Sequence, residues 1–100
     1  MDVVLDVRGR AHLRDADNFR GFKAVVPGQT ALGALSAANP ALIRAVQGDD
    51  HLWLDVNEVA RLGPNDEEWR SGFEKMIAYA QSKGWTRGNP LEVAAHVEAE

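Results

Sequence analysis

Residues 3–14 read VVLDVRGRAHLR, and this stretch decides the fold class. Apolar or small residues occupy every odd position from Val3 to Leu13, while polar residues occupy every even position from Asp6 to Arg14. Successive residues of a β-strand point to opposite faces of a sheet, so this period of two indicates one buried and one exposed face. We therefore expect Val3–Arg14 to form one long strand.

A second strand is expected over Phe19–Val26, which is rich in Phe and Val and ends at Pro27-Gly28. The polar break before it, residues 15–18, is too short for a parallel crossover, so the two strands are expected to form an antiparallel hairpin. Gly21 inside the second strand suggests a bulge or a close backbone approach.

The middle of the chain, residues 29–47, has the alanine and leucine content and the spacing of helices. Because proline is costly inside a helix, we expect a break at Asn39-Pro40, with Asn39 capping a second short helix that ends at Gly48. Residues 51–56 are short and apolar and predict a strand. Asp55 is placed to cap a turn of helix that runs through Leu62.

The second half of the chain carries the best-defined helix. A capping and acidic start at residues 63–68 precedes an apolar stripe with spacings of three and four, and Lys83-Gly84 ends it. The stripe consists of Trp69, Phe73, Met76, Ile77 and Ala80. Residues 91–98 alternate as a strand does, although Asn89-Pro90 also fits a helix cap. A strand is preferred here, and a helix is the alternative.

The resulting order, β-β-α-β-α-β, predicts an α+β fold over a single domain of residues 1–100. We expect a two-layer sandwich in which one antiparallel or mixed four-stranded sheet carries its helices on one face, ferredoxin-like in layout. About 100 residues is the commonest domain size, which leaves no room for a second core.

Composition excludes several function classes. The 100 residues carry 11 Lys+Arg, 15 Asp+Glu and no cysteine, which removes disulfides, thiolate metal sites and a catalytic thiol. No apolar run approaches the roughly 20 residues needed to span a bilayer, so no membrane partner is expected. The net charge of −4 argues against nucleic acid as a partner. The acidic start of the chain does not resemble a secretory signal, so a cytoplasmic location is expected.

Motifs for known chemistry are incomplete. Residues 28–33 have the glycine spacing of a phosphate loop, but Ala34 and Leu35 stand where Lys and Ser or Thr are needed. No cofactor is therefore expected.

The three histidines, His12, His51 and His96, each lie on a predicted strand. On neighbouring strands they could hold a metal such as zinc, with Asp55 or Glu98 as a carboxylate ligand. Scattered histidines on half-exposed strands are more often solvated, so no metal site and no catalytic residue is predicted.

Five residues are the candidates for a ligand site or an interface: Trp53, Phe22, Arg8, Arg10 and His12. If Leu52 and Leu54 face the helices, Trp53 points to the open face of the sheet, where a large aromatic side chain marks an interface or a binding groove. The alternative is that the helices cover Trp53 as a core residue. The arginines are shaped to receive a carboxylate or phosphate, or they are solvated residues that pair with the acid-rich second half.

Two hypotheses for function follow, and whether the protein is an enzyme stays open. The first is a non-catalytic interaction module that forms a homodimer, or docks on a protein partner, through the open sheet face. The alternative is a protein, or a cofactor-free small enzyme, that binds an anionic small molecule in a pocket at the sheet face, with His12 as acid or base.

Overall fold

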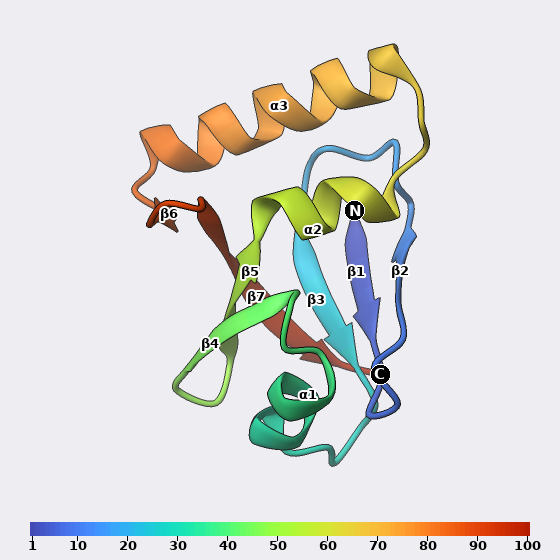
Figure 1. Ribbon diagram of the computed structural model, residues 1–100, viewed down its shortest axis with the longest axis vertical. Helices are drawn as coiled ribbons and strands as arrows, with labels where there is room; N and C mark the ends of the chain where they lie inside the picture. The colour runs from blue at the N-terminus through green and yellow to red at the C-terminus, as the bar shows by residue number, and fades with distance from the viewer.

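The computed structural model describes residues 1–100, which form one mixed sheet of seven strands and three helices (Figure 1). The elements in chain order are β1 (Asp2–Leu5), β2 (Ala11–Arg14), β3 (Lys23–Val26), α1 (Leu32–Ala38), β4 (Ile43–Gln47), β5 (His51–Asp55), α2 (Val56–Leu62), α3 (Glu67–Ser82), β6 (Thr86–Arg87) and β7 (Glu92–Ala99). The strand order across the sheet is β2-β1-β3-β7-β5-β4, and β6 pairs with β7.

The first stretch of the chain folds back on itself. The carboxylate of Asp6 accepts hydrogen bonds from the backbone N–H groups of Arg8 (2.8 Å) and Arg10 (2.9 Å). Gly9 adopts a φ of +81°, which most side chains disfavour. The chain therefore reverses, and β2 pairs antiparallel with β1. The expectation of one strand over Val3–Arg14 is wrong, because the alternation continues through a turn that Asp6 and Gly9 specify.

The strand β3 lies on the other edge of β1 and runs parallel to it, with Val3 paired to Ala24. The expected antiparallel hairpin between the first two predicted strands is therefore wrong: β3 pairs parallel with β1, and the antiparallel partner of β1 is β2 on its opposite edge. Residues 15–22 carry the chain across, and Phe19 and Phe22 pack against the core from this connection.

The second short helix expected after Pro40 is absent, and a strand, β4, takes its place. Asn39 ends α1 instead of starting a helix: its side-chain amide donates to the carbonyls of Asp6 and Leu35, both at 3.0 Å. The β-branched residues that follow pair with β5, beginning at Ile43 opposite Leu54. Tertiary pairing thus outweighs the helical composition of this segment.

The predictions for α2, α3 and the tail of the chain are confirmed. The Asp55 carboxylate accepts from the N–H of Glu58 at 3.0 Å and caps α2. All five residues of the predicted stripe on α3 are buried. The tail is a strand, β7, rather than the alternative helix.

The last strand joins the two halves of the sheet. Residues 92–96 of β7 pair antiparallel with β5, and residues 96–99 pair parallel with β3. The α+β class and the mixed sheet are confirmed. The four-stranded sheet and the ferredoxin-like order are wrong: the expected first strand is two strands, β1 and β2, and residues 43–47 and 86–87 supply strands that the sequence did not predict.

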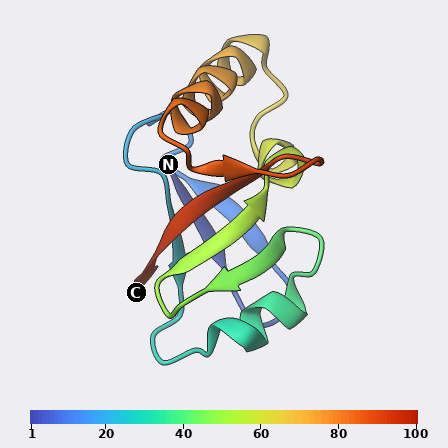
Figure 2. The same cartoon turned by 90° about the vertical axis from the view of Figure 1, so that its left-hand side faces the viewer.

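The helices sit over one face and the two ends of the sheet. Figure 1 shows α2 in front of the strands, and Figure 2 shows α3 and α1 at opposite ends. Buried side chains of the strands and helices form a single core that includes Val3, Leu5, Ala24, Leu52, Leu54, Val59, Phe73 and Val93. None of the three helices has both the length and the apolar composition needed to cross a membrane.

Candidate functional site

A groove of about 830 Å³ lies between α3 and the connection before β3. One wall comes from α3, where Gly72, Lys75, Met76 and Tyr79 recur at the spacing of one helix face. The other walls come from residues 19–22 and from the segment that holds Trp85, Val93 and Ala94. Nine of its 13 lining residues are hydrophobic, so the groove is mainly apolar.

Two large aromatic side chains stand exposed at this groove. Tyr79 is 58% exposed and Trp85 is 49% exposed, and their rings meet edge to face with centroids 6.1 Å apart. Backbone bonds hold Trp85 in place: its N–H donates to the carbonyl of Ala80 and its carbonyl accepts from Ala94, both at 2.9 Å. Exposed apolar area on a fixed backbone is typical of a binding surface.

Cations surround the apolar walls. Arg20 and Lys75 line the groove, and the Lys83 ammonium lies 5.5 Å from the centroid of the Tyr79 ring. None of these three cations belongs to any of the structure's ion pairs. The groove therefore combines an apolar interior with positive charge that the protein's own carboxylates leave uncompensated.

Trp53 lies on the face of β5 opposite the fully buried Leu52 and Leu54, as the alternation predicted. Its indole N–H donates to the side-chain carbonyl of Gln47 at 2.8 Å, and the Arg87 guanidinium lies 4.1 Å from its ring centroid. Trp53 is thus half-buried rather than a core residue, and polar side chains of the protein itself contact its ring. An interface at this face stays a prediction.

The structure does not bring the predicted site residues together. Arg8 and Arg10 lie at the exposed turn between β1 and β2, and His12 lies on β2 at the edge of the sheet. Three strands separate β2 from β5, which carries Trp53. Phe22 is in a third place, where it lines the groove beside α3.

Two other cations of the first strands, Arg14 and Lys23, pair with acids across the open face. Arg14 lies 3.1 Å from Asp2 and 2.7 Å from Glu100, and Lys23 lies 3.0 Å from Glu98. The hydrogen bond to Glu98 is the main reason that the pKa of Lys23 is raised. Arg14 and Lys23 thus pair with Glu100 and Glu98 of the second half, whereas the candidates Arg8 and Arg10 belong to none of the structure's ion pairs.

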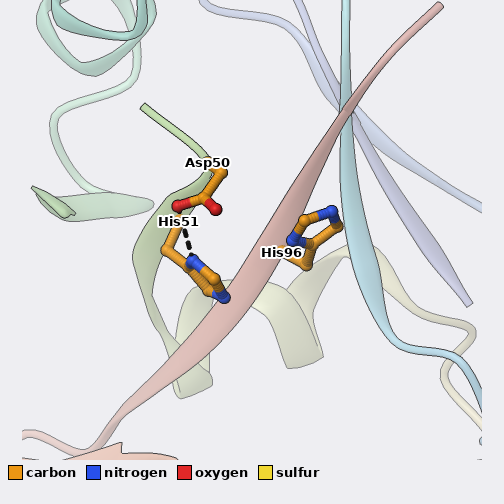
Figure 3. Close-up of side chains that lie close together, drawn as sticks. All are labelled: Asp50, His51 and His96. Atoms are coloured by element: carbon orange, nitrogen blue, oxygen red, sulfur yellow. Dashed lines mark hydrogen bonds and ion pairs between the residues drawn. The ribbon is translucent and has the colours of Figure 1, made fainter. Parts of the chain in front are cut away.

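Two of the three histidines do meet. His51 and His96 are directly opposite each other on β5 and β7, with ring centroids 5.3 Å apart (Figure 3). The nearby carboxylate is that of Asp50, 2.8 Å from Nδ1 of His51, rather than the expected Asp55 or Glu98. The hydrogen bond to His51 is the first cause that lowers the pKa of Asp50.

Of the groove residues, the sequence predicted Phe22 as a site candidate and Met76, Ile77 and Ala80 as core positions, but it did not single out Tyr79 or Trp85. Trp85 closes the end of a predicted helix and Tyr79 lies off the apolar stripe of α3; aromatic residues in these two places were the available signal. Comparisons with protein-family models, with curated proteins and with solved structures find no match for this chain.

Proposed function

We propose that this chain is a non-catalytic binding protein whose ligand is an amphipathic carboxylate, seated in the groove between α3 and residues 19–22. The observation that carries the proposal is the pairing of an apolar groove with three unpaired cations, Arg20, Lys75 and Lys83. The proposal keeps the alternative of an anionic small-molecule ligand from the sequence analysis, but it places the pocket beside α3 instead of at the open face of the sheet.

The size and chemistry of the groove fit a small ligand. Small-molecule sites occupy roughly 300–1,000 Å³ and are mostly apolar, with a few polar groups that fix orientation. An apolar chain laid against Met76 and Trp85 leaves water, and each buried methylene contributes about 0.8 kcal/mol. A carboxylate at the rim reaches the Lys75 ammonium, because lysine extends an apolar stem beneath a charged head.

The test uses decanoate as the probe and decyltrimethylammonium as a cationic control with the same alkyl chain. Titration calorimetry and tryptophan emission follow binding to the full chain, and the variant Trp85→Phe identifies the emission change that belongs to Trp85. We expect saturable binding of decanoate with a change in Trp85 emission. Because the rim is cationic, the control amphiphile should bind at least about tenfold more weakly.

A charge-reversal pair separates the groove from general attraction of the anion. Lys75→Glu should weaken decanoate binding about fivefold or more, since an exposed charge contributes up to about 1 kcal/mol and reversal replaces attraction by repulsion. Arg44→Glu makes the same change in net charge at an exposed residue of β4, outside the groove. Equal effects of the two variants, equal binding of both amphiphiles, or no saturable binding of decanoate would each refute the proposal.

A further inference from the structure

We propose that His51, His96 and Asp50 form a binding site for a zinc ion on the open face of the sheet. This site lies apart from the groove and is independent of the proposed function. The three side chains come from β5, from the residue before it and from β7, and Figure 3 shows them gathered around the two paired strands.

The backbone fixes the two imidazoles on one face. His51 and His96 are direct partners in the antiparallel ladder, where opposed Cβ atoms lie roughly 4.5–5.5 Å apart. The turn that carries Asp50 is tied to β7, because the Asp50 carbonyl accepts a 2.7 Å hydrogen bond from the N–H of Val97. All three ligands therefore sit on backbone that the sheet holds in place.

The distances are close to those of a metal centre. One ligand atom from each residue lies within 4.8 Å of the others, and an Asp50 oxygen is already 2.8 Å from Nδ1 of His51. Bonds of 2.0–2.2 Å to a tetrahedral zinc ion place ligand atoms about 3.3 Å apart. These side chains are exposed or half-exposed, so changes in their rotamers can move the ligand atoms by the remaining distance of about 1.5 Å without moving either strand.

The donor set favours zinc over calcium or magnesium. Two imidazoles and one carboxylate are nitrogen-rich ligands suited to zinc, whereas calcium and magnesium require mainly oxygen. The chain supplies three ligands, so a water molecule completes a tetrahedral ion. Lys23 neighbours His96 in the ladder, but Glu98 lies 3.0 Å from its ammonium and compensates its charge.

The test is a titration of the full chain with zinc chloride, followed by calorimetry and by the ¹⁵N chemical shifts of the histidine rings. We expect one zinc ion per chain, with shifts at His51 and His96 and none at His12. His12 is an internal control because it is exposed on β2, at the far edge of the sheet. This measurement on the unaltered chain does not depend on how any variant folds.

Variants then assign the ligands. His51→Ala and His96→Ala should each weaken zinc binding about tenfold or more, Asp50→Asn should weaken it in the same direction, and His12→Ala should change it less than about twofold. Equal losses for His12→Ala and His51→Ala would show adventitious binding by surface histidines and overturn the site. Ring shifts at all three histidines, or no saturable binding, would overturn it as well.

Discussion

Gly63 lies at the end of α2, where it touches the indole of Trp69. Its φ of −82° and ψ of 172° are open to any residue, so the backbone does not require glycine there. A Cβ at this position would lie well under 3.0 Å from ring carbons Cη2, Cζ3 and Cζ2 of Trp69. We therefore predict that Gly63→Ala destabilises the fold, because the added methyl group would clash with the indole and not because the backbone conformation requires glycine.

The indole has little freedom to move. Trp69 is 4% exposed, its N–H donates to the carbonyl of Ala16 at 2.9 Å, and its ring stacks on Phe73 with centroids 5.1 Å apart. Overpacking of this kind costs about 1–3 kcal/mol, and a strained hydrogen bond adds about 1 kcal/mol. Against this, alanine restricts the unfolded chain and contributes about 0.4–1 kcal/mol. The net expected loss is about 2 kcal/mol, or about 8–16 °C in Tm.

Urea unfolding, followed by far-ultraviolet circular dichroism, measures this change in the free energy of unfolding. Gly33→Ala is the matched control, because Gly33 lies in α1 and a Cβ there meets nothing within 4 Å. Alanine at that helical position should stabilise the chain by up to about 1 kcal/mol. A free energy of unfolding for Gly63→Ala within about 0.5 kcal/mol of the unaltered protein would refute the predicted clash with Trp69, and so would a shift of both variants in the same direction.

Two further predictions concern polar groups that hold backbone turns. Asp55→Ala should lower the free energy of unfolding by about 1 kcal/mol, because it removes the side chain that caps α2 at Glu58; urea unfolding measures the loss, and an unchanged midpoint would contradict it. Asp6 has a lowered pKa in the folded chain, mainly through its hydrogen bond from the backbone of Arg10 and also through that from Arg8. Its contribution is present above the unfolded-state pKa of about 4 and is lost as the pH falls through the lower folded-state value. Asp6→Asn should therefore reduce the acid-induced loss of stability below about pH 4, and an identical pH profile for both proteins would refute this role.

The sequence predicts an element correctly where residue spacing, composition and capping residues all indicate the same structure. The stripe from Trp69 to Ala80 has helical spacing and a capping start, and the Asp55 cap directly follows an apolar strand. Residues 43–47 could not be assigned in this way, because helical composition and strand pairing conflict there and only the partner strand decides. The reversal at Asp6 was hidden for a different reason. Apolar and polar residues keep alternating in the sequence through the turn, so the pattern alone does not show where the strand ends.

The candidate sites depend on which segments become neighbours in the folded chain, and a single sequence does not reveal this. The groove is assembled from residues 19–22, α3 and the segment around Trp85, so its walls are adjacent only after folding. His51 and His96 meet because β5 and β7 pair in one register, and a shift by one residue would place the two imidazoles on opposite faces. Trp53 was predicted correctly to face away from Leu52 and Leu54, because strand alternation alone determines that direction.

The position of β7 has a consequence for biosynthesis. This strand contributes hydrogen bonds to both β3 and β5, yet a ribosome makes it after the other six strands of this sheet. Until residues 92–99 emerge, β3 and β5 each keep an edge without its final partner, and such edges are prone to pair with other chains. Joining them also needs contacts between distant parts of the chain, which form slowly. The sheet is therefore completed only after these residues are synthesised, and nascent chains that stall before them leave an edge of β3 and an edge of β5 unpaired.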